Sequence, residues 1–498
     1  MQGTYLIGGG IVLLSITGAG IYASRKVKSS EDFSTGGRRA NSFLVAGTLM
    51  GTMVGGAATI GTAQVAFCFG LSGWWFCLGA GIGFLLLASR LGRRLYESSM
   101  DTIPQVLAKT YGRQIGPIVA VFTSFGIYFS FLANTLAFVA LCSSILRIAP
   151  MQAAAFGTFL VLMYVMFGGV WGTGLAGVLK VVFVYAALLY CGVAAYIRVG
   201  GISGLGSAFS FHPWFSLFGR GYGVDFAAGF SMLLGVLSTQ TYFQAIASAK
   251  SFKAARRGAL ISAIITPLVG LGAVLVGLYM RSAFPATPSS EALPAFALAF
   301  LPPMLAGAVL ATLLVAVVGC SAGLALGMST MFTLDIYKQY VRPQAGQKEV
   351  LLVQRASLLV TCLGALLFVN GNVGTLILGL SFLSMSLRGC TVLFPLLAAM
   401  FLPGFVTAKA GSAAALLGPL TAFLWHILFP RGIDPLYPGL IASLVILTVV
   451  SVLDRGNRHH GDDMRSAIHI SPGSPLEQAV TADIQSLDES VCHPQMHL

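Results

Sequence analysis

The sequence predicts an all-α polytopic membrane protein, and three observations support this fold class. Hydrophobic residues make up 56% of the 498 residues and charged residues only 9%, whereas an ordinary soluble domain has about 25% charged residues. Apolar runs of roughly 20 residues recur along the whole chain, and each is long enough to cross a hydrocarbon core about 30 Å thick. The runs are continuous, whereas the strands of a membrane β-barrel are segments of about 10 residues with alternating hydrophobicity.

Thirteen transmembrane (TM) helices are predicted. They lie near residues 4–24, 42–67, 72–96, 115–146, 149–167, 178–199, 225–249, 258–281, 296–333, 351–370, 373–401, 408–429 and 436–454. No basic residue precedes the first span, whereas Arg25, Lys26 and Lys28 follow it. This charge order is the reverse of that in a cleaved signal peptide, so we expect a retained first helix with its N-terminus outside. Segment 296–333 exceeds the length of one straight span, so it should tilt or extend past the membrane.

The distribution of basic residues supports this topology. Of the 29 Lys and Arg residues, 23 fall on the predicted cytoplasmic side, Lys180 among them, and 5 on the outer side, with Arg388 left inside the membrane. Cytoplasmic loops of membrane proteins carry the excess of Lys and Arg. We therefore expect a multi-pass protein of the cell inner membrane with its C-terminus in the cytoplasm. The formal net charge of +13 reflects the ends of spans and does not indicate nucleic-acid binding.

Other function classes find little support in the sequence. The eight cysteines are scattered, without the spacing of a metal site or a redox pair. No P-loop pattern is present, so we expect no ATP-driven activity. His426 has no carboxylate or metal-ligand partner at a suitable spacing, so we expect no enzyme activity. The polar segment 456–498 is expected to be a disordered cytoplasmic tail, and the chain to be a monomer or a weak oligomer.

Two apolar spans are interrupted by glycine and polar residues, at residues 51–64 and 238–244. Secondary transporters bind their solute near the membrane midplane where two helices break, at matching positions of two halves of the chain. The two interrupted spans lie five spans apart, as such a pair would. The predicted solute site consists of Gly55, Gly56, Gln64, Gln240 and Tyr242. The alternative is that the glycines only permit close helix packing.

Arg388 lies close to the middle of the span near 373–401. A charge at this depth costs at least about 2.5 kcal/mol on insertion scales, and no Asp or Glu is predicted inside the membrane to pair with it. Two roles are open. The guanidinium can be structural, bonded to carbonyls at a helix break, or it can bind solute, because its fork matches the two oxygens of a carboxylate. The second role adds Arg388 to the solute site and predicts a small organic anion or an amino acid.

Short motifs along the chain resemble, in order, those of the sodium:solute symporter family. They are Glu31-Asp32-Phe33 with Gly36-Gly37-Arg38, the stretch from Gly55 to Gly61, Gly70-Leu71, Thr102-Ile103-Pro104 with Tyr111-Gly112, Gly168-Gly169, residues 244–257, and Ser329-Thr330 through Lys338. The resemblance implies a core of five-plus-five helices as inverted repeats, with one helix before and two after. The expected regions are an N-terminal helix and loop (1–41), the transport core (42–402), two C-terminal helices (403–455) and the tail (456–498).

The resemblance also implies where a sodium ion would bind. In the family, backbone carbonyls of the first broken helix and of a later helix hold the ion together with two adjacent hydroxyls. The corresponding positions here are Gly51, Val54, Ala316, Gly319 and Cys320. The carbonyls remain, but Gly319 and Cys320 lack the hydroxyls. Ser321 lies about 100° further round the helix, so it would serve only if the helix were rotated or locally unwound. Ala176, Gly177 and Lys180 also replace residues that are common in the family.

These observations predict a secondary active transporter, a symporter that moves a small organic solute by alternating access. Sodium is the expected coupling ion, bound at a degenerate site, and no other cofactor is expected. A proton-coupled or uncoupled transporter of the same fold is one alternative. Another is a transporter-like solute sensor acting in trans. The expected partners are the solute and the lipid bilayer, without nucleic acid or ATP.

Overall fold

The computed structural model describes residues 2–24, 38–369, 376–402, 404–429 and 432–467, with residues 164–176, 455–467 and parts of the first helix described by their backbone alone. Within this part of the chain every regular element is a helix, which confirms the predicted all-α class. The tail beyond Ala467, the loop with Arg25, Lys26 and Lys28, and the side chain of Ala176 lie outside the described residues.

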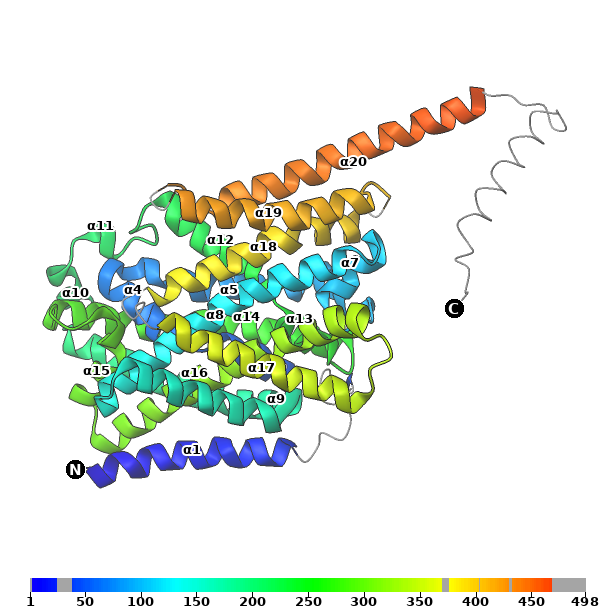
Figure 1. The fold of residues 1–498 in the computed structure, drawn as a ribbon. Coiled ribbons are helices and arrows are strands. Elements are labelled where there is room, and N and C mark those ends of the chain that lie inside the picture. Colours follow the sequence, from blue (N-terminus) through cyan, green and yellow to red (C-terminus); the bar gives the residue numbers. More distant parts are fainter. Residues whose placement is uncertain (1, 25–37, 370–375, 403, 430–431, 468–498) are drawn as a thin grey trace.

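The described helices form one bundle. The first half of the chain contributes α1 (Gln2–Ser24), α3 (Ser42–Met53), η2 (Ala57–Gly61), α4 (Thr62–Phe69), η3 (Gly70–Trp74), α5 (Trp75–Leu87), α6 (Arg90–Glu97), α7 (Ile103–Tyr111), α8 (Ile115–Leu146), α9 (Pro150–Arg198), α10 (Gly201–Ala208) and α11 (Phe211–Trp214). The second half contributes α12 (Tyr222–Ser238), α13 (Gln240–Ala247), α14 (Phe252–Ala283), η4 (Ser289–Glu291), α15 (Ala292–Phe300), α16 (Pro303–Met331), η5 (Phe332–Val341), α17 (Gln347–Val369), α18 (Ile377–Phe401), α19 (Ala408–Leu428) and α20 (Leu436–Ala467). Figure 1 shows that most of the long helices run in roughly the same direction.

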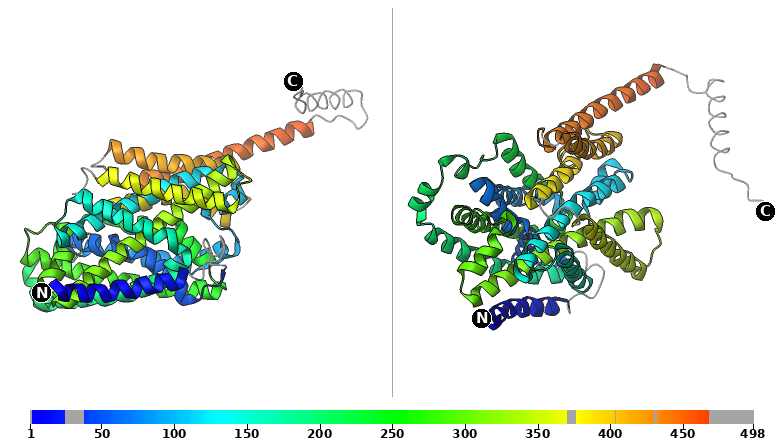
Figure 2. Two further views of the ribbon diagram at one scale, coloured as in Figure 1. Left: turned by 60° about the horizontal axis from the view of Figure 1, so that its bottom comes forward. Right: turned by 60° about the vertical axis from the view of Figure 1, so that its left-hand side comes forward.

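The helices divide into a centre and a periphery. α18 packs against α8 and α12, and α16 packs against α8 and α9; both α16 and α18 are buried over most of their length. α17, α19 and α20 keep most of their length exposed. α1 lies along α9 and α16 at one edge of the bundle, and α19 and α20 lie at the opposite edge (Figures 1 and 2).

The described residues contain nine helices that are long and apolar enough to cross a membrane, or ten if α12 and α13 form one bent span. Two further apolar helical segments are shorter, namely α3 (Ser42–Met53) and the first part of α9, Pro150–Met163. The predicted total of thirteen spans therefore remains a prediction. α9 runs through both of the spans predicted near 149–167 and 178–199.

The first predicted helix break is confirmed. α3 ends at Met53, Val54 leaves the helical conformation with φ −82° and ψ 85°, and the chain resumes its helical path at η2. The backbone N–H of Gly56, freed by the break, donates to Oδ1 of Asn134 on α8 at 2.9 Å. A buried backbone N–H without such an acceptor would be costly, so Asn134 makes the break tolerable inside the bundle.

The second predicted break is also confirmed. α12 and α13 meet at Thr239, which is extended with φ −91° and ψ 121°, and the chain bends there by 50°. Hydroxyl groups satisfy carbonyls at the end of α12, because Ser238 Oγ donates to the carbonyl of Leu234 at 2.8 Å and Thr239 Oγ1 to that of Gly235 at 2.5 Å.

One predicted span is wrong. Segment 296–333 is not one tilted span: α15 ends at Phe300 and α16 begins at Pro303. Pro302 and Pro303 have no N–H to donate, so two consecutive helical hydrogen bonds would be lost and the helix breaks there. The last predicted span, 436–454, coincides with the apolar span Leu436–Asp454 of α20, and the helix itself continues to Ala467.

Candidate functional site

Arg388 lies on the central helix α18 next to the second break. Its side chain is completely buried. The Nη1 group donates to Oγ1 of Thr239 at 2.5 Å, which ties the guanidinium directly to the bend between α12 and α13. The Nη2 group donates to Oγ of Ser130 on α8 at 3.2 Å and to Oγ of Ser384 at 2.9 Å.

All hydrogen-bond partners of Arg388 in the described part of the chain are neutral. The remaining partners are the carbonyl of Ser384, at 3.1 Å from Nε, and the sulfur of Met385, at 2.8 Å from Nη2. The ion pairs among the described residues involve other arginines and lysines. Gly126 of α8 makes room for the side chain, since a Cβ there would lie 2.7 Å from Cγ of Arg388. The site thus holds a buried positive charge without a counter-charge.

The other predicted solute-site residues are all buried near the two breaks. Gly55 and Gly56 serve close packing in this conformation, because a Cβ at Gly55 would lie 2.4 Å from Cβ of Cys320 and one at Gly56 would lie 2.3 Å from Cβ of Ala137. Tyr242 packs edge-to-face against Phe84, with ring centroids 5.5 Å apart.

The two glutamines bind backbone groups of neighbouring elements. Oε1 of Gln64 accepts from the N–H of Ile377 at 3.2 Å, at the start of α18. Gln240 donates from Nε2 to the carbonyl of Asp101 at 2.8 Å and accepts from the N–H of Ile103 at 3.0 Å. Both side chains therefore join a broken helix to an element outside it.

Lys180 of α9 occupies the position expected for the sodium ion. Its Nζ donates to the carbonyl of Gly51 and, at 3.2 Å, to the carbonyl of Ala316. These two carbonyls belong to α3 and α16, and both were predicted to face the ion. Lys180 is predicted to lie at a cytoplasmic end of a span, and in the structure its side chain is only 2% exposed, so it is buried inside the bundle.

The packing of α9 against α3 explains how Lys180 reaches this point. Gly177 lies three residues earlier on the same face of α9, and a Cβ at Gly177 would lie 2.5 Å from the carbonyl oxygen of Gly47. The absence of a side chain lets the two helices approach closely. The ammonium one turn further on then projects between α3 and α16.

The other predicted sodium positions surround this ammonium or its helices. A Cβ at Gly319 would lie 3.4 Å from Nζ of Lys180. The thiol of Cys320 donates to the carbonyl of Thr52 at 2.6 Å, so it is used in joining α16 to α3. The backbone N–H of Val54 bonds to Met50 at the end of α3, and Ser321 is buried on α16. Sequence reasoning missed Lys180, Asn134 and Thr239, although the position of Lys180 had been noted as unusual for the family.

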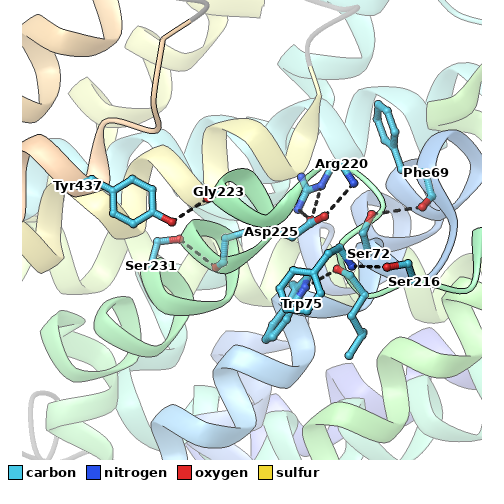
Figure 3. A network of polar contacts seen from close by, with 12 residues as sticks. Phe69, Ser72, Trp75, Ser216, Arg220, Gly223, Asp225, Ser231 and Tyr437 are labelled. Atoms are coloured by element: carbon cyan, nitrogen blue, oxygen red, sulfur yellow. Dashed lines mark hydrogen bonds and ion pairs between the residues drawn. The ribbon is translucent and has the colours of Figure 1, made fainter. Parts of the chain in front are cut away.

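Polar contacts hold the end of the bundle where α12 begins (Figure 3). Asp225 is fully buried and pairs with Arg220, with Nη2 and Oδ1 2.6 Å apart. The indole N–H of Trp75 donates to the carbonyl of Leu217 at 2.6 Å. The hydroxyl of Tyr437 on α20 donates to the carbonyl of Gly223 at 2.8 Å. The loop before α12 is thereby joined to α5, and α12 to α20.

A second set of contacts closes the other end of α12, roughly 20 Å away at 1.5 Å per residue. Besides the bonds from Gln240 to the segment before α7, Thr102 and Gln105 donate to Oδ1 of Asp335 at 3.0 Å and 3.3 Å. Oδ2 of Asp335 is buried without a hydrogen-bond partner among the described residues. The second break and Arg388 therefore lie at the α13 end of α12, next to the contacts of Gln240, and the cluster around Asp225 lies at the other end of α12.

Comparisons with known proteins agree with this architecture. The chain is 25% identical over 484 residues to the osmoregulated proline transporter OpuE of Bacillus subtilis (strain 168), an alignment that covers 90% of this chain and 94% of that one. It is 24% identical over 480 residues to the high-affinity choline transporter 1 of Caenorhabditis elegans, which covers 87% of this chain and 82% of that one.

Among solved structures, the fold is similar to that of a Na+-coupled sialic acid symporter in a substrate-bound outward-open state, with a TM-score of 0.72 at 14% identity, over 90% of this chain and 98% of that one. The sequence model of the Sodium:solute symporter family matches residues 33–420. The chain is therefore a multi-pass membrane protein that belongs to the sodium:solute symporter family.

Proposed function

We propose that this chain is a secondary transporter that carries a small organic solute with a carboxylate group across the cell inner membrane by alternating access. The observation that supports it most directly is Arg388, a fully buried guanidinium at a helix break whose hydrogen-bond partners in the described chain are neutral. A buried charge without a counter-charge is costly, and a solute carboxylate would supply the missing negative charge.

The geometry favours a carboxylate over a cationic solute. The guanidinium binds the two oxygens of a carboxylate side by side, whereas it would repel a quaternary ammonium. Relatives include a proline transporter and a choline transporter. Of these two solute types, the amino acid fits Arg388. We therefore propose an amino acid or a small organic acid as the solute.

The proposed solute-binding residues are the ones predicted from the sequence, and their contacts divide them into two groups. Arg388 and Tyr242 lie at the second break, together with Thr241, whose buried Oγ1 has no hydrogen-bond partner among the described residues. Gln64 and Gln240 are engaged with backbone groups. They would contact solute only after these bonds open, so we assign them to the change between the two access states.

The proposed topology has the N-terminus outside and the C-terminus in the cytoplasm, as the basic residues suggest. The polar clusters at the two ends of α12 would then act as an outer gate around Asp225 and a cytoplasmic gate around Asp335. Sodium is the coupling ion expected from the family, and a proton-coupled or uncoupled transporter is the alternative. A solute sensor acting in trans would bind solute without moving it.

Two measurements test this function. Thermal unfolding of the purified protein against a panel of amino acids, carboxylates, nucleobases, sugars and choline identifies the solute class, because a ligand of the folded state raises the apparent stability. Counterflow of the binding solute in proteoliposomes then separates a transporter from a sensor. We expect an amino acid or a carboxylate to bind and to exchange; binding without exchange would favour the sensor, and binding of choline or sugars alone would contradict the carboxylate proposal.

A further inference from the structure

The cation position between α3 and α16 is defined by two hydrogen bonds and the space beside Gly319. Nζ of Lys180 donates to the carbonyls of Gly51 and Ala316, one from each helix. Gly319 leaves room for the ammonium, because a Cβ there would lie 3.4 Å from the same nitrogen. The ammonium therefore stands where carbonyls of two separate helices converge, and it joins α3 to α16 through a side chain from a third helix, α9.

We infer that the Lys180 ammonium is the resident cation of this position, so that the chain binds its solute without sodium. The inference rests on the proposed function of the same site and specifies how that function works. A positive charge between the two helices would be supplied by the protein itself, tethered by a covalent side chain. Its presence would not depend on the sodium concentration on either side of the membrane.

The residues present do not fit a sodium ion in addition to Lys180. Two carbonyl oxygens that would coordinate the ion already accept hydrogen bonds from Nζ. Of the two positions where the family has hydroxyls, Gly319 has no side chain, and the Cys320 thiol is a soft group that donates to the carbonyl of Thr52. Hard cations prefer oxygen ligands, and soft sulfur ligands select other metals.

The same features fit a lysine. Its ammonium carries three donors and no acceptor, and it meets carbonyl acceptors at the convergence of two helices. Gly319 leaves space beside Nζ that a serine hydroxyl would narrow, and Gly177 lets α9 approach α3 closely enough for the side chain to reach. Compared with the sodium site of the family, this position lacks the two hydroxyls and contains a lysine instead. Both differences favour a side-chain ammonium over a bound sodium ion.

The test measures sodium binding directly and needs no knowledge of the solute. The full-length protein is purified as wild type, Lys180→Met and the triple variant Lys180→Ala, Gly319→Ser, Cys320→Ser. Thermal unfolding is followed in sodium chloride and in potassium chloride of equal concentration. Binding of 22Na+ to the same proteins gives a second readout, and Lys253→Ala, which removes an exposed lysine, is the matched control.

We expect wild type, Lys253→Ala and Lys180→Met to bind no 22Na+ and to unfold at the same temperature in both salts. The triple variant should bind 22Na+ and gain roughly 2 °C in Tm in sodium at a tenfold excess over Kd. Wild type that binds 22Na+, or that sodium stabilises as much as the triple variant, would overturn the inference. If the triple variant fails to fold, the wild-type result still decides. Failure of solute exchange with a sodium-independent wild type would reject the proposed function and leave this inference standing.

Discussion

The ammonium of Lys180 and the carbonyl of Ala316, 3.2 Å apart, connect α9 to α16, two helices whose contacting residues are far apart in the sequence. The same ammonium also reaches the carbonyl of Gly51 on α3. α3 belongs to the first broken span and α16 to the later half of the chain. A single side chain therefore joins the two parts of the bundle that carry the candidate cation position. Four further predictions concern the groups that position this site and close it.

Gly177→Ala should separate α9 from α3. The new Cβ would lie 2.5 Å from the backbone carbonyl oxygen of Gly47, which cannot move aside as a side chain would. We expect a loss of about 1–3 kcal/mol in unfolding free energy, the usual cost of overpacking. Thermal unfolding of the purified variant measures it. Gly206→Ala is the control, because a Cβ there meets no atom within 4 Å; equal stability of the two variants would contradict the close helix contact.

Arg388→Lys should weaken solute binding more than it weakens folding. Lysine keeps the charge but lacks the planar fork that binds two carboxylate oxygens. We expect at least a tenfold loss in affinity, or about 1.4 kcal/mol, for the carboxylate that the binding panel identifies. The affinity is measured on purified, folded protein, so a lower yield of the variant does not affect the value. Arg256→Lys, an exposed position, is the control, and an unchanged affinity in Arg388→Lys would leave Arg388 a structural role only.

Asn134→Ala should destabilise the first break. The backbone N–H of Gly56 would lose its acceptor, Oδ1 of Asn134, now at 2.9 Å. A buried donor left without a partner costs about 1–3 kcal/mol, and we expect a fall of that size in unfolding free energy. Thr135→Val on the next position is the control, since its hydroxyl bonds only within α8. Hydrogen exchange of the Gly56 amide should rise in Asn134→Ala alone; unchanged exchange would mean that another group satisfies it.

Asp225→Asn should loosen the polar cluster shown in Figure 3. Asp225 is fully buried and Arg220 has a side-chain exposure of 14%, so the substitution leaves a largely buried guanidinium without its counter-charge. We expect a loss of about 2–4 kcal/mol. The pair Arg93–Glu97 has side-chain exposures of 64% and 53%, and such a pair contributes at most about 1 kcal/mol. Thermal unfolding should therefore separate Asp225→Asn from Glu97→Gln, and similar values for the two would contradict the burial argument.

The helix breaks could be predicted from sequence because their causes are local. Gly55 and Gly56 interrupt an apolar run, and the polar residues from Ser238 to Gln244 interrupt another. In the structure the backbone leaves the helical conformation at both places. The split between α15 and α16 had an equally local cause in Pro302 and Pro303, and the prediction of one long span overlooked it. Arg388 was recognised as unusual because a charge within an apolar run is costly wherever the run packs.

The all-helical class, the two breaks and the family follow from short stretches of the sequence, because apolar length, glycine and proline act on the chain locally. The surroundings of each buried charge depend instead on how distant helices pack. Lys180 lies near the start of an apolar run and is predicted from sequence to end a span, yet it is buried, because Gly177 lets α9 pack against α3 and the Gly51 carbonyl near the end of α3 accepts a hydrogen bond from its ammonium. Its acceptors, Gly51 and Ala316, lie more than a hundred residues away on either side. No local sequence pattern predicts the contact of Lys180 with these two carbonyls, since it depends on how three helices pack together.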